Sequence, residues 1–171
     1  MRLFKAGEMS ERMRKKIEGW LREEGQFARY LKDENANWVI LANHPRNQPT
    51  TITIFNPLAS PGRVVLQMVL NIAEEAQQPF RKMSPREREA LLLELRMEAN
   101  RRPTEFGMVH PEGVLQRITF SYELFEDGLT KNGLFRGMNE VYKSLLQIQW
   151  LLQARLGPAR GREEESGIGF R

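Results

Sequence analysis

The spacing of apolar residues predicts two kinds of secondary structure along the chain. Three long stretches place apolar residues three and four positions apart, as one face of a helix requires: 10–24, 84–100 and 130–157. Six shorter stretches are predicted as strands, from alternation or from apolar and β-branched residues between turns: 27–31, 38–42, 50–55, 64–72, 104–110 and 115–125. The stretch 64–72 would also suit a helix, but its alternation and the preceding Pro61-Gly62 favour a strand. Residues 73–81 predict only a short helical turn that stops near Pro79.

Residues at the ends of these stretches indicate where the helices begin and end. Ser10 is the expected N-cap of the first helix, and Gly25 is expected to end it in the left-handed conformation. Ser84, Pro85 and Glu87 form the capping-box pattern at the start of the second helix. The third helix is expected to start near Thr130 and to stop at Gly157-Pro158.

The order of the elements predicts an α+β fold. Their order is α-β-β-β-β-α-β-β-α, and connections of hairpin length favour an antiparallel β-sheet flanked by helices. We expect residues 1–157 to form a single domain. Residues 158–171, with three glycines around a run of three glutamates, predict a disordered C-terminal tail.

Length and composition restrict the class of protein. The chain has 171 residues, 40% hydrophobic and 28% charged, which is typical of one globular domain. It contains no cysteine, which excludes disulfides and thiolate metal sites. Without a long apolar stretch or a secretory signal at the start, it is expected to be cytoplasmic and not associated with a membrane. Nineteen of the 26 basic residues are arginine, a bias typical of a GC-rich or thermophilic source.

The net charge of +4 is concentrated at the start of the chain. Residues 1–32 contain nine basic and five acidic side chains, whereas later segments are balanced. Four bases of the first helix form a candidate nucleic-acid-binding face: Arg12, Lys15, Lys16 and Arg22. Glutamates at spacings of three to five lie among them and predict intrahelical ion pairs instead. Nucleic acid is therefore an alternative partner and not the favoured one.

Candidate catalytic and metal-binding residues are sparse. His44 and His110 precede prolines in two separate loops, and their spacing does not indicate a metal site. Asp127 and Gly128, ahead of the last helix, resemble a turn that binds a phosphate or a metal. A structural role explains them better: Gly128 makes the turn, and Asp127 or Thr130 caps the helix. No phosphate-loop or nucleophile-elbow motif is present. We expect no enzyme activity, no cofactor and no metal.

Three stretches resemble a known family. They are Phe27–Trp38 (FARYLKDENANW), Phe80–Met97 with the capped helix MSPREREALLLELRM, and Ile118–Leu134 (ITFSYELFEDGLTKNGL). In order and spacing they are similar to an uncharacterised prokaryotic family, mostly archaeal, over about residues 10–156. The resemblance implies the type III secretion chaperone-like fold, which YbjN-like proteins share, and a tendency to dimerise. It implies no activity.

These observations favour a non-enzymatic protein-binding module, chaperone-like or adaptor-like, that acts as a homodimer on a protein partner or client. The wide apolar stripe of the last helix suggests a dimer interface that contains Leu145 and Leu152. Trp20, Trp38 and Trp150 occupy stripe or strand positions and are expected in the core or at that interface.

Overall fold

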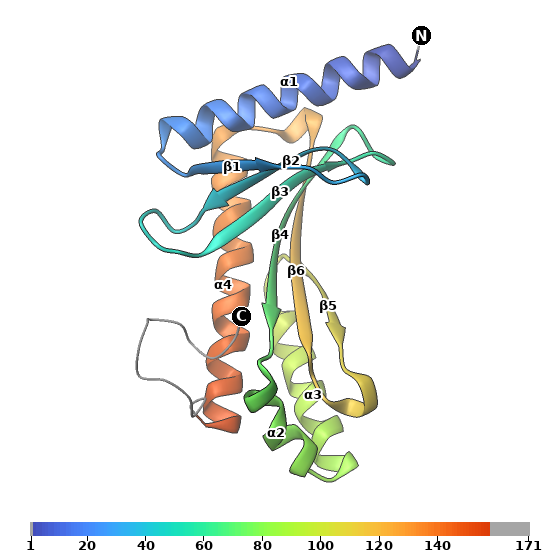
Figure 1. Cartoon of the computed structure of the whole chain (residues 1–171), viewed down its shortest axis with the longest axis vertical. Coiled ribbons are helices and arrows are strands. Elements are labelled where there is room, and N and C mark those ends of the chain that lie inside the picture. Colours follow the sequence, from blue (N-terminus) through green and yellow to red (C-terminus); the bar gives the residue numbers. More distant parts are fainter. Residues whose placement is uncertain (1, 158–171) are drawn as a thin grey trace. The chain divides into compact units, whose positions relative to one another are not determined.

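The computed structural model describes residues 2–157, and it describes side chains from residue 6 onward. Its elements, in chain order, are α1 (Arg2–Glu23), β1 (Phe27–Leu31), β2 (Ala36–Asn43), β3 (Thr51–Pro57), β4 (Arg63–Asn71), α2 (Glu74–Lys82), α3 (Pro85–Ala99), β5 (Glu105–Val109), η1 (Pro111–Gly113), β6 (Arg117–Phe125), η2 (Glu126–Gly128) and α4 (Lys131–Leu156) (Figure 1). The six strands form one sheet in the order β1-β2-β3-β4-β6-β5. Mixed helix and antiparallel sheet confirm the expected α+β class. The expected tail lies outside the described residues.

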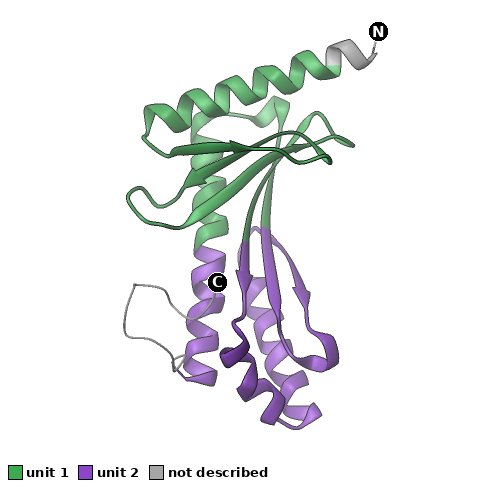
Figure 2. Ribbon diagram, viewed as in Figure 1, with its two compact units in different colours: residues 1–68, 121–142 green, residues 69–120, 143–171 purple. Residues whose placement is uncertain are grey.

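The described chain divides into two compact units, each built from two separate segments (Figure 2). Unit 1 comprises residues 1–68 and 121–142, and unit 2 comprises residues 69–120 and 143–171. The elements β4, β6 and α4 therefore each contribute one part to each unit. A single domain over residues 1–157 stays a prediction.

Unit 1 contains α1 and an antiparallel arrangement of β1, β2, β3 and the first part of β4. Alternation buries Ile52, Ile54 and Asn56 on one face of β3. Helical spacing buries the α1 residues Met13 and Ile17 against the sheet, with Leu21 one turn further on. The core of this unit also contains Ile40, Leu66, Leu134, Met138 and Val141.

Unit 2 contains α2, α3, β5, the start of β6 and the ends of β4 and α4. Its core includes Phe80, Leu91, Leu92, Leu95, Leu115, Ile118, Phe120, Ile148 and Leu152, all buried. The capping box at the start of α3 is confirmed: the Glu87 backbone N–H donates to Ser84 Oγ (3.3 Å), and the Ser84 N–H donates to Glu87 Oε2 (2.7 Å). The run 64–72 is a strand, as its alternation predicts.

The helix ends predicted at Gly25 and Thr130 are confirmed, because no contact with a distant part of the chain competes with the capping interaction. Gly25 takes a positive φ of 68° and ends α1, with the Gln26 N–H donating to the Leu21 carbonyl (2.7 Å). Thr130 caps α4, because its Oγ1 accepts from the Gly133 N–H (3.0 Å). Asp127 and Gly128 form the short turn η2 just before it.

Two predicted helix ends are wrong. The first helix starts at Arg2 and not at Ser10, because the Ser10 side chain lies inside the unit and donates to Asn56 Oδ1 (2.6 Å) instead of capping. The turn at 73–81 is a full helix, α2, that continues through Pro79. Proline has a helical φ and removes only one N–H, and the carbonyl that loses this donor belongs to the exposed Glu75.

Candidate functional site

The four candidate basic residues of α1 lie on one outward-facing part of the helix. At 3.6 residues per turn, Arg12, Lys15, Lys16 and Arg22 fall within about one third of its circumference. Three of them have acidic partners: Arg12 Nη2 is 3.0 Å from Glu126, Lys15 Nζ is 3.9 Å from Glu11, and Arg22 Nη2 is 2.9 Å from Glu18. Within the described part of the chain, Lys16 has no ion pair. The positive charge of this face is therefore largely neutralised by the protein itself.

A second charged cluster joins α1 to β1. The Tyr30 hydroxyl donates to Glu18 and accepts from Arg14, which also contacts Glu11. Burial raises the pKa of Tyr30, and the hydrogen bond from Tyr30 lowers the pKa of Glu18. A tyrosine held protonated between a carboxylate and a guanidinium stabilises the contact of β1 with α1. It provides no free base.

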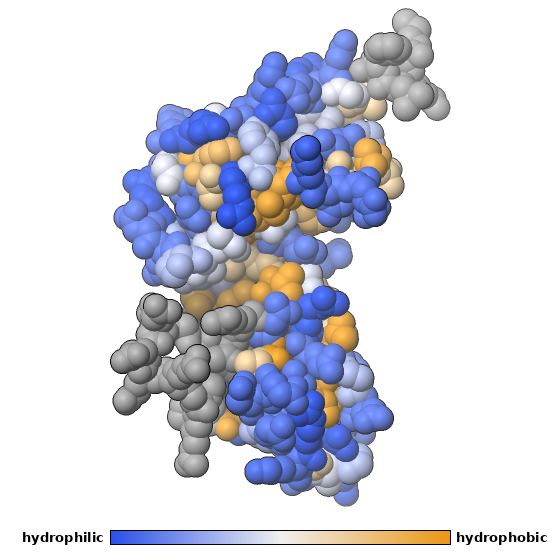
Figure 3. All heavy atoms as spheres, in the orientation of Figure 1, coloured by the Kyte–Doolittle hydropathy of each residue, from blue (hydrophilic) through white to orange (hydrophobic). Residues whose placement is uncertain are grey.

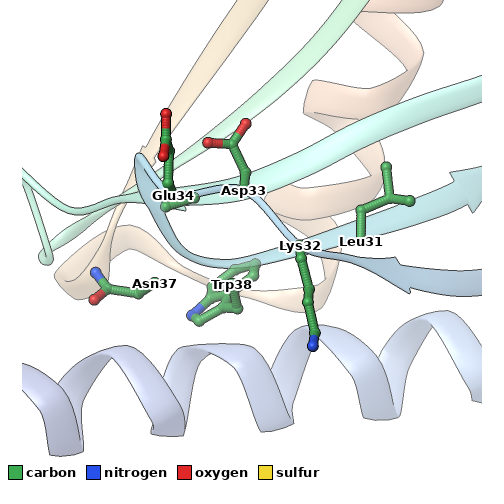
Figure 4. Close-up of a pocket in the computed structure, with 7 residues that line it drawn as sticks. Leu31, Lys32, Asp33, Glu34, Asn37 and Trp38 are labelled. Atoms are coloured by element: carbon green, nitrogen blue, oxygen red, sulfur yellow. The ribbon is translucent and has the colours of Figure 1, made fainter.

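The turn between β1 and β2 borders a pocket of about 570 Å³ (Figure 4). In this view Lys32 and Trp38 point toward α1, whereas Asp33 and Glu34 point away from it. Trp38 Nε1 donates to the backbone carbonyl (3.1 Å) and to Oγ (3.0 Å) of Ser10, so the indole is fixed. Asp33 accepts from the Asn35 N–H (2.8 Å) within its own turn. These contacts hold Trp38 and Asp33 in place, so the pocket is a rigid part of the β1–β2 hairpin.

The two histidines belong to different units. In unit 1, His44 is buried, its Nδ1 lies 3.0 Å from Gln26 Nε2, and its ring packs edge-on against Tyr142 at 5.6 Å. Burial lowers the pKa of His44. In unit 2, His110 Nε2 lies 3.0 Å from Arg96 Nη2. Among residues 2–157, no group of three or more metal-ligating side chains is brought together.

A second pocket, of about 350 Å³, lies in unit 2 between α3 and the turn η1. Its lining residues are Pro85, Arg88, Glu89, Leu92, Arg96, His110, Glu112 and Gly113. Arg88, Leu92 and Arg96 recur every four residues and so lie along one side of α3. In the sequence, this spacing predicts that Arg88 and Arg96 share one side of a helix. Their proximity to His110 depends on the tertiary fold and is not predicted by the spacing. We call this site the Arg88 pocket.

The edges of the sheet differ in how they are protected. β1 forms one edge, and its pairing with β2 shifts register between Phe27 and Arg29. Such a bulge with an adjacent charge discourages strand addition. β5 forms the other edge, carries Gly107 at its centre, and has one charged residue, the exposed Glu105 at its first position. Its outward backbone groups have no strand partner in the described chain.

The two residues expected at a dimer interface, Leu145 and Leu152, are buried within the single chain. Leu145 is 8% exposed and Leu152 is fully buried, both within the single chain. A substitution at either position would therefore disturb the chain's own core, whatever its oligomeric state. The most exposed large apolar side chains described in unit 2 are Leu93 and Met97 on α3 and Trp150 on α4. The surface view shows hydrophobic residues interspersed among a mainly hydrophilic exterior (Figure 3).

Comparison with known proteins identifies relatives of this chain. A family model described as "Uncharacterized conserved protein (DUF2299)" matches residues 13–152. A crystal structure of an uncharacterized protein from Methanothermobacter thermautotrophicus is similar, with a TM-score of 0.81 and 30% sequence identity over 85% of this chain and 99% of that chain. No curated protein matches. The expected resemblance to an uncharacterised family is confirmed, and the similar structure is of an archaeal protein. No helix in residues 2–157 is long and apolar enough to span a membrane.

Proposed function

We propose that this chain, which belongs to the DUF2299 family, is a non-enzymatic protein-binding module, chaperone-like or adaptor-like, that acts in the cytoplasm. The observation that carries the proposal is the open edge of β5. An extended segment of a partner protein would form main-chain hydrogen bonds with the outward N–H and C=O groups of this strand. Side chains of the segment would then lie alternately on the two faces of the sheet.

The contrast between the two edges supports the choice of β5. Both edges carry one charged residue, Arg29 on β1 and Glu105 on β5, but only β1 has a shifted register, at Ala28, which opposes a further strand. The Tyr30 side chain of β1 is also already bound to α1. At β5, Gly107 leaves space beside the backbone, and the exposed Val109 offers an apolar contact. The type III secretion chaperone-like fold, with its relation to YbjN-like proteins, is part of the same proposal and is supported by the α+β sheet with its helices.

We also propose that the protein acts as a homodimer. The apolar side chains of Leu93, Met97 and Trp150 are 54%, 65% and 60% exposed, and they lie on two helices that pack together through Glu98–Gln147 and Glu94–Arg155 contacts. Covering such side chains with a second copy would remove apolar area from water. Replacing Met97 and Trp150 with lysine should convert a dimer to a folded monomer, as measured by sedimentation and circular dichroism. A wild-type chain that sediments as a monomer would contradict the dimer.

Peptide display tests the proposed binding directly. The intact chain is immobilised and used to select from a library of random peptides, and hydrogen exchange is then measured with and without a selected peptide. We expect slower exchange at the amides of β5 and unchanged exchange at β1, which serves as the internal control. Alternate N-methylation of the peptide backbone should abolish binding, because it removes the N–H donors of a paired strand. No enrichment, or protection confined to α1 and β1, would contradict strand addition at β5.

Nucleic acid is the alternative proposal. It is supported by the outward position of Arg12, Lys15, Lys16 and Arg22, and it is weakened by the acidic partners of three of them. Phosphate contacts release counterions, so an affinity for DNA or RNA should fall steeply between about 50 and 200 mM salt. Anisotropy titrations with labelled duplex DNA and single-stranded RNA measure this dependence. Tight, salt-sensitive binding that is lost in a variant with these four bases changed to glutamine would favour the alternative.

A further inference from the structure

The Arg88 pocket contains an arginine without a polar partner. Arg88 Nε is buried and makes no hydrogen bond, and no ion pair of Arg88 is formed within the described residues. Arg63 also buries its Nε without a partner, but its Nη1 binds Glu123 at 2.8 Å. A buried donor that is left unsatisfied destabilises a folded protein, and more strongly when it is charged. Arg88 is therefore the group in this pocket that most requires an acceptor.

Arg96 supplies further donors to the same pocket. Its Nη2 lies 3.0 Å from His110 Nε2, and because a guanidinium only donates, this nitrogen of His110 is the acceptor. The contact places the proton of a neutral His110 on Nδ1. One guanidinium has five N–H donors, so most of those on Arg96 are free of this contact. Arg88 and Arg96 thus present two guanidinium groups along one side of α3, with Leu92 between them.

Glu89 and Glu112 also line the pocket, but within the described residues neither forms an ion pair with Arg88 or Arg96. Among the described residues, no carboxylate oxygen comes within 4.0 Å of a nitrogen of Arg88 or Arg96. The two carboxylates do, however, affect which anion the pocket would accept. They repel a doubly charged phosphate more strongly than a singly charged carboxylate. The planar fork of an arginine matches a carboxylate in a bidentate arrangement.

The pocket lies directly after the open edge of the sheet. His110 follows Val109, the last residue of β5, and Gly113 of the turn η1 packs beside the Arg88 side chain. A segment that pairs with β5 would therefore pass the mouth of the pocket with its backbone already aligned. We propose that Arg88 and Arg96 bind a carboxylate of that segment, either an acidic side chain or the C-terminal carboxylate. This inference rests on the proposed strand addition and specifies its partner as an acidic peptide.

The test uses peptides selected by display against the intact wild-type chain. We expect the selected peptides to share an aspartate or glutamate at one position, or a free C-terminus. Arg88→Gln and Arg96→Gln should each weaken binding about tenfold or more, since a charge-assisted hydrogen bond is worth about 1.5–3 kcal/mol. Replacing the peptide's acid by its amide should cause the same loss in wild type and little further loss in Arg96→Gln. Arg86→Gln, on the exposed side of α3, is the matched control and should bind as wild type does.

The outcomes separate this inference from the function on which it rests. Peptides that protect β5 from exchange but share no acid, or that bind both glutamine variants unchanged, would overturn the carboxylate site and leave strand addition intact. Absence of peptide binding would overturn both. Displacement of the peptide by inorganic phosphate at lower concentration than by acetate would overturn the choice of a carboxylate. Because Arg96 is exposed, Arg96→Gln should remain folded even if Arg88→Gln does not, and circular dichroism checks both.

Discussion

Asn56 in unit 1 and Arg88 in unit 2 differ in how completely their buried polar atoms are hydrogen-bonded. In unit 1, all the hydrogen-bonding atoms of the fully buried Asn56 side chain are used: Oδ1 accepts from Ser10 (2.6 Å) and Asn37 (2.7 Å), and Nδ2 donates to the carbonyls of Pro61 (3.0 Å) and Arg63 (2.6 Å). In unit 2, the buried Nε of Arg88 binds nothing among residues 2–157.

The difference separates a structural polar network from a binding one. Asn56 connects α1, β2 and the start of β4 through side-chain and backbone contacts, so its polarity serves the fold of unit 1. Arg88 makes no such connection, although unit 2 satisfies other buried groups, as the 2.8 Å contact between Thr104 and Ser144 shows. Unit 1 also buries two side-chain atoms without a partner, His44 Nε2 and Arg63 Nε, but those side chains have other polar contacts, to Gln26 and Glu123. Arg88 has none among the described residues, and we propose that a ligand supplies its acceptor.

The largest expected effect comes from breaking the complete network. Asn56→Ala removes four hydrogen bonds and leaves the Ser10 hydroxyl and two backbone carbonyls without this partner. We expect the free energy of unfolding to fall by about 3 kcal/mol or more. Chemical denaturation measures it, with Asn37→Ala as a control that removes a more exposed partner and should lose about 1 kcal/mol. Equal losses in the two variants would show that the network is not cooperative.

The second effect concerns how tightly unit 1 is packed around its network. A Cβ at Gly137 of α4 would lie 2.7 Å from Leu66 Cδ1 and from Tyr122 Cδ1, whereas a Cβ at Gly19 of α1 meets nothing within 4 Å. Gly137→Ala should therefore lose about 1–3 kcal/mol of unfolding free energy. Gly19→Ala should gain about 0.5–1 kcal/mol, because alanine favours a helix interior. Thermal melts of both variants compare the two sites, and a neutral Gly137→Ala would show that the helix can shift.

The third effect has the opposite sign and tests the incomplete site. Arg88→Met keeps much of the apolar stem and removes the buried donor that has no partner, so we expect unit 2 to gain about 1 kcal/mol. The same variant should lose the acidic peptides. Arg86→Met, at an exposed position of the same helix, should change stability by less than about 0.5 kcal/mol. Destabilisation by Arg88→Met would indicate that the guanidinium serves the fold, as Asn56 does.

The smallest effect is the pH dependence of unit 1 at His44. Burial lowers the pKa of this imidazole in the folded protein, so the unfolded chain binds the proton more readily. The contribution of neutral His44 to stability is complete above the unfolded pKa of about 6.5 and is lost as the pH falls through the folded value. Unfolding free energies of wild type and His44→Gln, measured between about pH 8 and pH 5, should differ less at the acidic end. A constant difference would contradict the assignment.

What could be predicted from the sequence was local. Gly25, the Ser84 capping box and Thr130 act through neighbours a few residues away, and all three predictions are confirmed. The neighbours of Ser10 favour it equally as an N-cap, but its hydroxyl donates instead to Asn56, which lies 46 positions away in the sequence. The same limit applies to the site. The recurrence of Arg88 and Arg96 is visible in the sequence, but the burial of one nitrogen and the approach of His110 arise only when β5 and η1 pack on α3.

The division of each unit into two separate segments has a consequence for synthesis on the ribosome. Residues 1–68 emerge first, but the segment that completes their unit, residues 121–142, follows only after residues 69–120 have been made. The core residues Leu134, Met138 and Val141 of this unit are therefore added only after part of the other unit has been translated. For the same reason no contiguous fragment of the gene encodes either unit, and a truncation designed to isolate the β5 edge would remove the end of α4 that completes its core.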